Sequence, residues 1–344
     1  MKKNFPVSRL FIISCVFFMC FTVPPELLHA QRPRTVTINL ASSLPRNSPW
    51  GRILDRIAAD WAKITNGEVN LHILHQYPGS EGDYLMKLRQ DKIQAAILTS
   101  MALNSIAPEI MALSVPLLIR DDDEMDAVLK EVRPTLNARI EQEGYINLVW
   151  VKAGWVKIFS RSPVFVPNDL RRLKLGTSPD EHEIMDAFKA MGYNLVPVSL
   201  PDVPQRLNSG MIDAVYQSPI SASAFQLYRV AKNLSPVNLA PFMGGVLMSR
   251  KAWINIPEKY RSQLMESARK AGAEIEDSFQ KSETDAIADM LQNGLILNEM
   301  NAAQEAEWYR DVQGYLPEMA NRGIFHKEMY ERILGILQNY RQER

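Results

Sequence analysis

The stretch that decides the fold runs from Leu170 to Pro219 and reads LRRLKLGTSPDEHEIMDAFKAMGYNLVPVSLPDVPQRLNSGMIDAVYQSP. Three short apolar segments of this stretch are predicted strands: 173–177, 195–198 and 212–216. A helix is predicted between the first two strands, because apolar residues recur there at helical spacing until Gly192. A second, shorter helix opens at Pro201 and closes at Gly210. Strand and helix therefore alternate through the whole stretch.

This alternation predicts crossover units and a parallel sheet. In open parallel sheets, ligands bind outside the carboxyl ends of the strands, where loops meet the N-termini of helices. Residues 176–178 and 216–218 stand at two such strand ends. Thr177 or Ser178 is also the predicted N-cap of the first helix. These two loops are therefore the first candidates for a ligand site.

Three motifs of the stretch form an ordered series: Asp169-Leu170 with Leu173-Lys174, Ala190-Met191-Gly192 with Val196-Pro197-Val198, and Leu207-Asn208-Ser209-Gly210-Met211-Ile212-Asp213-Ala214. Their order and spacing resemble the signature of the solute-binding proteins of TRAP transporters, the tripartite ATP-independent periplasmic transporters of the DctP type. The strand-helix-strand pattern of residues 35–73 and the turn of residues 77–82 resemble the amino-terminal part of the same family. The resemblance covers essentially all of the chain beyond residue 34.

The resemblance implies an α/β fold of the two-lobed periplasmic binding protein type, class II-like, with mixed sheets flanked by helices and a long helix bracing both lobes. Length agrees, because the roughly 310 residues after the first segment exceed a comfortable single core. The expected organisation is a signal peptide at 1–30, lobe I at 34–153 plus about 240–280, and lobe II at 154–239 plus about 281–344. Periodicity predicts helices at 220–231, 252–291 and 302–340.

The first thirty residues are typical of an export signal. Lys2, Lys3 and Arg9 lead into an apolar run from Leu10 to Val23, which is too short to span a bilayer comfortably. Leu28-His29-Ala30 then precedes the expected cleavage point. We expect a periplasmic protein exported by a cleaved signal peptide, and an uncleaved, membrane-anchored form is the alternative.

Catalytic and metal-binding signals are sparse in this sequence. Both cysteines, Cys15 and Cys20, fall inside the signal segment, so the mature chain would carry neither disulfides nor thiol chemistry. No Gly-x-Ser-x-Gly elbow is present, and the 39 basic residues, balanced by 39 acidic ones, form no stripe for nucleic acid. The acidic run 121–124 could be read as a cation site, but we interpret it as charge at a helix N-terminus. We expect no enzyme, metal or cofactor.

The resemblance implies that most relatives hold a ligand carboxylate with an arginine at the position of Gly176, and often with a second at Val156. Both arginines are missing here, and Lys157 is expected to face the side opposite to Val156. Arg46 or Arg161 could compensate from a loop. We therefore expect a pocket for a hydrophobic or amphipathic organic ligand. The alternative is a small monocarboxylate bound through such a non-standard basic residue.

The candidate ligand-binding residues combine aromatic or apolar walls with a few hydroxyl and amide groups. They are Ser43, Tyr77, Ser100, Trp155, Gly176, Thr177, Tyr216, Gln217, Phe242 and Met243. The asparagine that relatives often carry near the end of the third strand is replaced by Gln217 or Ser218. Trp155 and Phe242 could equally be ordinary core aromatics.

The resemblance also implies how such a protein works. A small organic ligand would stabilise the closed form of two lobes, and a membrane permease with one small and one large subunit would recognise that form. Some of these transporters include a helical-repeat partner protein, for which the sequence shows no surface. A periplasmic ligand sensor of the same fold and an exported enzyme are the other two classes of function.

Overall fold

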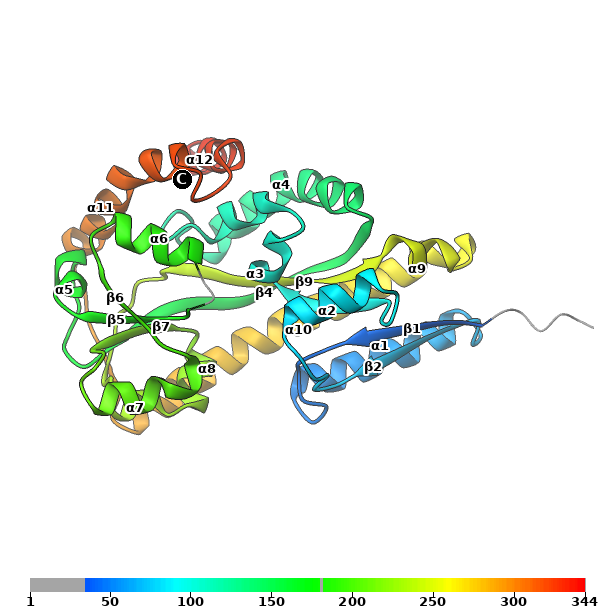
Figure 1. Ribbon diagram of the computed structural model, residues 1–344, viewed down its shortest axis with the longest axis horizontal. Helices are drawn as coiled ribbons and strands as arrows, with labels where there is room; N and C mark the ends of the chain where they lie inside the picture. The colour runs from blue at the N-terminus through cyan, green and yellow to red at the C-terminus, as the bar shows by residue number, and fades with distance from the viewer. Residues whose placement is uncertain (1–34, 180–181, 344) are drawn as a thin grey trace, which may run out of the picture. The chain divides into compact units, whose positions relative to one another are not determined.

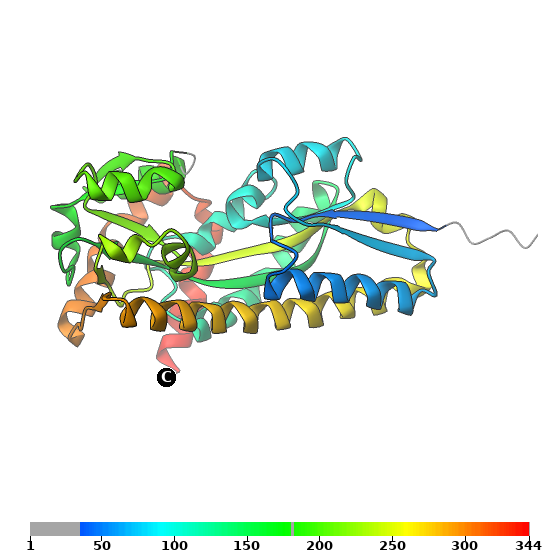
Figure 2. The same cartoon turned by 90° about the horizontal axis from the view of Figure 1, so that it is seen from below.

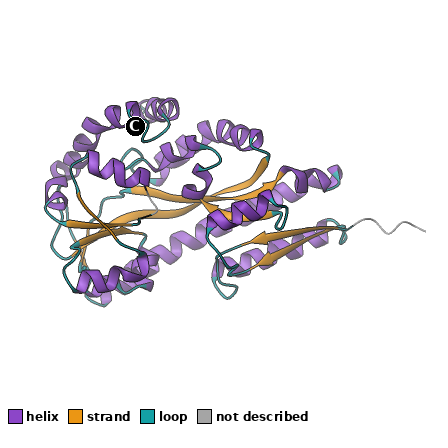
Figure 3. Ribbon diagram, viewed as in Figure 1, coloured by secondary structure: helices purple, strands orange, loops and turns teal. Residues whose placement is uncertain are grey.

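The computed structural model describes residues 35–179 and 182–343. The expected signal peptide, residues 1–30, lies outside this range, as do Asp180 and Glu181. In the described part of the chain, ten strands form one mixed sheet with helices against its faces (Figures 1 and 3). The main strand order is β2-β1-β3-β9-β4-β7-β5-β6, with β8 beside β4 and β10 beside β8. The predicted α/β class with a mixed sheet is confirmed.

The first half of the sheet consists of β2 (Val69–Leu74), β1 (Val36–Ala41), β3 (Ala95–Thr99), β9 (Ala240–Ser249) and β4 (Tyr145–Ser160). β1 is parallel to both β2 and β3, whereas β9 is antiparallel to β3 and β4. The parallel pairing of β1 with β2 confirms the crossover unit predicted for residues 35–73. The parallel pairing of β1 with β3 brings the carboxyl ends of these two strands to the same edge of the sheet.

Helix α1 (Pro49–Ile64) connects β1 to β2. The Ser48 hydroxyl caps it by accepting a 3.0 Å hydrogen bond from the backbone N–H of Gly51. Its apolar face is buried, with Trp61 fully inaccessible to solvent. Past its end, Gly67 takes a φ of 79°, the left-handed conformation that terminates many helices.

The second half of the sheet contains β7 (Ala214–Gln217), β5 (Lys174–Thr177) and β6 (Asn194–Pro197), with α6 (His182–Ala190) and α7 (Val203–Asn208) between them. β5 is parallel to both β6 and β7, as the alternation in this stretch predicts. Gly192 follows the end of α6 and has a φ of 80°, the left-handed conformation that terminates many helices. The predicted end of this helix is therefore confirmed. The predicted N-cap of α6 falls next to undescribed residues and stays a prediction.

Strand β4 belongs to both halves, because it pairs with β9 along its first part and with β7 at its end. A bulge interrupts the β4–β9 register between Lys152 and Trp155. Gly154 lies in this bulge with a φ of 100°, and the Glu283 carboxylate occupies the space that a Cβ would need. Glu283 also accepts a 3.2 Å hydrogen bond from the backbone N–H of Trp155. The bulge therefore requires glycine at this position.

Helix α10 (Glu258–Gln292) runs along both halves of the sheet and packs against α1, β4 and α8 (Figure 2). Gly272 allows the close approach to β4, since a Cβ there would collide with Val149. The packing of α10 along both halves of the sheet confirms the predicted long helix, although the helix begins at Glu258 and not at residue 252. A separate helix, α9 (Arg250–Asn255), precedes it, and Pro257 stands between the two.

Two other predicted helices are too long. The helix expected at 220–231 is only α8 (Pro219–Ala224), because Gln226 adopts a positive φ of 53°. The helix expected at 302–340 is two helices, α11 (Ala302–Asn321) and α12 (Lys327–Gln342), separated by a turn in which Gly323 has a φ of 73°. The remaining helices and strands are α2 (Glu81–Arg89), α3 (Ser100–Asn104), α4 (Asp122–Gln142), α5 (Pro167–Arg171), β8 (Asn233–Leu234) and β10 (Ile296–Leu297).

The acidic run at 121–124 begins α4, as interpreted from the sequence. Asp121 caps the helix by accepting a 2.8 Å hydrogen bond from the N–H of Glu124. Glu124 itself is buried and forms a two-pronged pair with Arg341 of α12, with both N–O distances at 2.7 Å. Across the described ranges there is no group of three His, Cys, Asp or Glu side chains that could hold a metal ion. In the same ranges no helix has the length and apolar character needed to cross a bilayer.

Candidate ligand-binding site

A cavity of about 270 Å³ opens where β1 and β3 end, beside the start of α8 and the middle of α10. Its walls are mainly apolar. The lining residues are Ser43, Leu44, Trp50, Glu81, Ile97, Leu98, Thr99, Val151, Ala153, Ser218, Ile220, Ser221, Phe242, Met243, Gly244, Gly245, Val246, Ile275 and Phe279. Concave sites of this kind, at strand carboxyl ends, are where α/β proteins bind small molecules.

An aromatic pair forms one wall of the cavity. Trp50 at the start of α1 stacks on Phe279 of α10, with ring centroids 4.4 Å apart and planes 17° from parallel. The indole Nε1 of Trp50 is buried and has no hydrogen-bond partner in the described residues. Since α1 and α10 are far apart in sequence, the wall exists only because both helices pack on the sheet.

A single carboxyl group stands among these walls. Glu81, the first residue of α2, accepts two hydrogen bonds from Thr99 on its Oε2, at 3.0 Å from the backbone nitrogen and 2.7 Å from the hydroxyl. Burial raises the pKa of the Glu81 carboxyl, and the bonds from Thr99 oppose this in part. Among the described lining residues, none is lysine, arginine or histidine.

The edge near the second half of the sheet is polar. Ser218 is the N-cap of α8 and accepts a 3.3 Å hydrogen bond from the N–H of Ser221. Both serines line the cavity. Ser218 is one of the two residues that replace the asparagine expected in relatives, so the sequence analysis points to this turn.

Three of the ten predicted residues line the cavity: Ser43, Phe242 and Met243. Ser100 lies just beyond Thr99, is buried, and is 3.4 Å from the Ser114 hydroxyl. Tyr77 packs against the Tyr84 ring, at a centroid distance of 5.6 Å, on the other side of the β2–α2 turn. Neither Ser100 nor Tyr77 is part of the cavity wall in this structure.

The predicted residues Tyr216 of β7 and Trp155 of β4 pack into the core. Tyr216 stacks on Phe188 of α6, with centroids 5.4 Å apart. Trp155 is buried and donates a 3.1 Å hydrogen bond from Nε1 to Asp122. Gln217 stands opposite Lys157 in the β4–β7 ladder. A direct role for these residues in ligand binding stays a prediction.

Gly176 and Thr177 lie at the end of β5, away from the cavity lining. A Cβ on Gly176 would approach Ile212 Cδ1 to 2.9 Å and Val198 Cγ1 to 3.0 Å. A side chain at the position of the arginine expected in relatives would therefore have to displace the ends of two apolar side chains. The Thr177 hydroxyl is buried without a partner in the described part of the chain.

The basic residues that could replace the missing arginines have other contacts. Arg46 lies 3.3 Å from Asp55, and Arg161 lies 3.8 Å from Asp213. Lys157 donates a 2.6 Å hydrogen bond to Asn238, and burial lowers the pKa of its ammonium group. None of the three belongs to the cavity lining.

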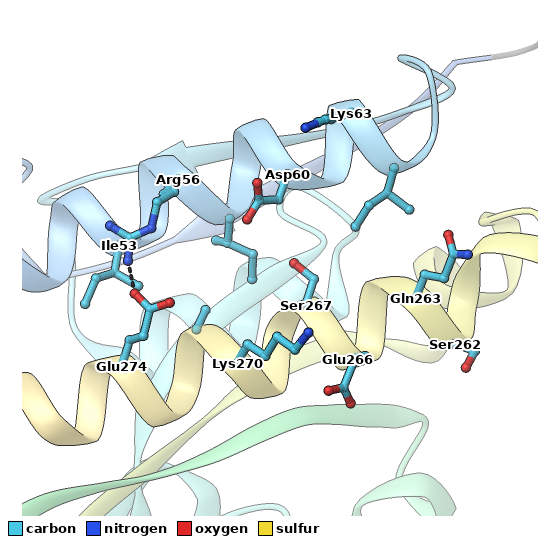
Figure 4. A pocket seen from close by; sticks show the side chains of 13 residues that line it. Ile53, Arg56, Asp60, Lys63, Ser262, Gln263, Glu266, Ser267, Lys270 and Glu274 are labelled. Atoms are coloured by element: carbon cyan, nitrogen blue, oxygen red, sulfur yellow. Dashed lines mark hydrogen bonds and ion pairs between the residues drawn. The ribbon is translucent and has the colours of Figure 1, made fainter.

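A larger groove of about 740 Å³ runs between α1 and α10 (Figure 4). Charged side chains of both signs border it, and Arg56 of α1 pairs with Glu274 of α10 across it. Lys63 and Asp60 lie farther along the α1 side of the same groove. We assign the ligand site to the smaller cavity, because that cavity lies at the strand ends and its walls are apolar.

The sequence does not predict several residues of the cavity lining, among them Trp50, Glu81, Thr99, Ile275 and Phe279. Glu81 and Thr99 follow a glycine turn and a strand end, which are signals that could have identified them. The α10 residues carry no such local signal, because a helical pattern does not say which of its turns meets a cavity.

Fold and cavity together define a two-lobed binding protein for small molecules. The sequence model of the DctP family, described as bacterial extracellular solute-binding protein, family 7, matches residues 40–322. The chain belongs to this family of solute-binding proteins.

Known relatives agree with this assignment. A solute-binding protein of Chromohalobacter salexigens is 23% identical over 260 residues, 75% of this chain and 77% of that protein. An uncharacterized protein of Haemophilus influenzae is 26% identical over 238 residues, 68% of this chain and 72% of that protein.

Solved structures of TRAP periplasmic solute-binding proteins share the fold. One from Ochrobactrum anthropi has a TM-score of 0.81 at 20% identity and covers 90% of this chain and 97% of its own. One from C. salexigens with bound D-glucuronate has a TM-score of 0.76 at 21% identity, and the match covers 88% of this chain and 99% of that chain. One from Sulfurospirillum deleyianum with bound succinate has a TM-score of 0.72 at 21% identity, covering 88% and 98%.

Proposed function

We propose that this protein captures an apolar or amphipathic organic molecule in the cavity and delivers it to the small and large membrane subunits of a TRAP permease. The observation that carries this proposal is the composition of the cavity wall. Aromatic and aliphatic side chains from α1, β3, β4, β9 and α10 surround it, and no cationic side chain is among the described lining residues. Apolar walls with few polar groups favour ligands with a large apolar surface.

Charge supports the same ligand class. A free carboxylate moved from water into this cavity would lose its hydration without gaining a cation in return. An arginine at Gly176 would have to displace the ends of the Ile212 and Val198 side chains, and neither Gly176 nor Val156 offers a charge. An apolar ligand has no such penalty, since its burial removes hydrocarbon surface from water.

An organic acid is the second candidate, because solved relatives hold D-glucuronate and succinate. An acid would need a basic side chain to reach the cavity when the protein closes. Arg46 is the best placed, since it follows the lining residues Ser43 and Leu44 in the same exposed loop. It would have to leave Asp55 to do so.

The delivery step rests on closure of the two lobes. We keep the lobe boundaries near residues 153/154, 239/240 and 280/281 as proposals, and the bulge at Gly154 supports the first of them. A ligand that touches both lobes stabilises the closed form by its difference in affinity for the two forms. The permease would then select the closed form. A sensor would use the same closure with another receptor.

Native mass spectrometry of the gently purified protein tests the ligand class. We expect a co-purified apolar or amphipathic molecule at about one per chain, released by denaturation and identified in the extract. Recovery of a small carboxylate instead would overturn the apolar assignment and favour the second candidate. The same spectrum gives the mass of the exported chain, which we expect to begin at Gln31 after removal of residues 1–30.

A further inference from the structure

Glu81 holds an unusual position in the cavity. Of the described residues that line it, Glu81 is the one with a formal charge, and most of the others are apolar. A carboxylate at the start of a helix is ordinarily stabilised by the helix dipole and by water. Here the carboxyl group is largely withdrawn from water, and burial is the main cause of its raised pKa. The group therefore faces an unfavourable environment when it is ionised.

The hydrogen bonds of Glu81 leave one oxygen open. Both bonds from Thr99 end on Oε2, and the described residues provide none to Oε1. Oε1 is also absent from the fully buried polar atoms that lack a partner, so it retains some accessible surface. The two bonds fix the orientation of the carboxyl group against the end of β3. The second oxygen is thus an oriented acceptor in a mainly apolar cavity.

None of the described lining residues carries a positive charge that could pair with this acceptor. Burial and the two Thr99 bonds account for the pKa shift of Glu81, without a contribution from any charged neighbour. The other acidic residue of the first turn of α2, Asp83, accepts hydrogen bonds from Ser80 and is absent from the cavity lining. The other polar side chains of the described lining are the neutral hydroxyls of Ser43, Thr99, Ser218 and Ser221.

We propose that Glu81 determines the specificity of the site by receiving a hydrogen-bond donor, an ammonium or hydroxyl group, at the polar end of an otherwise apolar ligand. This inference rests on the proposed function and names its ligand class more closely. An ammonium group would pair with the carboxylate and offset its burial, and a hydroxyl group would satisfy Oε1. A ligand carboxylate would meet a like charge and be rejected.

Three probes with the same ring and similar length test the proposal: 2-phenylethylamine, 2-phenylethanol and phenylacetate. Calorimetric titration of the ligand-stripped full-length mature protein is expected to show the amine or the alcohol binding at least about tenfold more tightly than phenylacetate. The preferred probe distinguishes the ammonium from the hydroxyl. Phenylacetate binding as tightly as both, or no binding of either donor, would overturn the proposal.

Glu81→Gln isolates the charge, because its amide oxygen can still accept both bonds from Thr99. We expect this variant to bind the preferred donor probe about tenfold more weakly than the wild type does. The difference in affinity between that probe and phenylacetate should become smaller. Glu276→Gln is the matched control: Glu276 is another carboxyl with a pKa raised by burial, it accepts a 2.8 Å bond from the Lys152 N–H, and it lies outside the cavity. It should leave binding unchanged.

Phe279→Ala, which alters the cavity wall, distinguishes a failure of the Glu81 proposal from a failure of the proposed function. If Glu81→Gln binds all probes like the wild type while Phe279→Ala loses them, the cavity is the site and the role of Glu81 is wrong. If neither variant changes the binding of a probe that the protein does bind, the cavity is not the site. That second result would overturn the proposed function as well.

Discussion

The two halves of the sheet contribute differently to the candidate site. The first half and α10 provide nearly all of the cavity wall, including Phe242, Met243 and the stacked pair of Trp50 and Phe279. The second half contains the stretch that reveals the family, yet it contributes only the start of α8. Its best candidate, Tyr216, stacks inside the core. The motifs that identify the family thus specify core packing, while the cavity is built by elements that carry weaker sequence signals.

The largest expected effect is on the core of the second half. Tyr216→Ala removes a buried ring that stacks on Phe188, so we expect it to lower the free energy of unfolding by about 3–5 kcal/mol. Urea denaturation monitored by circular dichroism measures this loss. The fraction that stays folded should bind ligand normally. A stable variant that had lost its ligand would place Tyr216 in the site and break the comparison.

Phe279→Ala should have the opposite profile. Phe279 is only partly buried and stacks on the Trp50 ring, so we expect a loss of about 0.5–1.5 kcal/mol in stability. Ligand affinity should fall by at least about tenfold, because the ligand loses an aromatic wall. Thermal unfolding with and without the co-purified ligand measures both quantities. Unchanged ligand affinity would contradict the assignment of this wall.

Gly176→Arg tests whether the second half can regain the anchor expected in relatives. The new Cβ would press on Ile212 and Val198, so we expect a destabilisation of about 1–3 kcal/mol and no gain of succinate binding. Gly314→Arg, in an exposed part of α11 with open space around the glycine, is the control for the added charge. Succinate binding by a fully stable Gly176→Arg protein would show that the position does face the ligand.

The smallest effect concerns the two carboxyl groups at the start of α2. The pKa of Glu81 is raised, so the folded state holds its proton more strongly than the unfolded state. Its contribution to stability therefore declines as pH rises from about 4.3 through the raised pKa. The pKa of Asp83 is lowered by hydrogen bonds from Ser80, so its contribution is lost as pH falls through that lowered value.

Urea titrations from pH 3 to pH 8 of Glu81→Gln and Asp83→Asn check these signs. The stability of Glu81→Gln relative to wild type should increase with pH, whereas that of Asp83→Asn should decrease. Parallel curves for the two variants would show that the cavity does not impose a distinct environment on Glu81.

Much of the fold follows from local sequence patterns. The strands and helices between Leu170 and Pro219 are correctly predicted, because short-range periodicity and Gly192 decide them. The early end of α8 is missed, since Gln226 takes a left-handed conformation that its residue type does not announce. The break before α12 is missed although Gly323 marks it.

The site is less predictable than the fold. Ser43 is identified because it follows the carboxyl end of the first predicted strand, and Phe242 and Met243 are identified as apolar wall residues. Phe279 and Ile275 reach the cavity through the packing of α10 on β4, which depends on Gly272 and Val149 rather than on their own neighbours in sequence. Tyr216 sits at a strand end as well, but its ring turns toward Phe188. Strand position alone does not decide the direction of a side chain.

A crystal structure of the protein with its co-purified ligand tests the central claim most directly. The account predicts ligand density against Trp50, Phe279 and Phe242, with a polar atom within hydrogen-bonding distance of Glu81 Oε1. Density for an acid at the end of β5, in contact with Gly176, Thr177 and Tyr216, would contradict it.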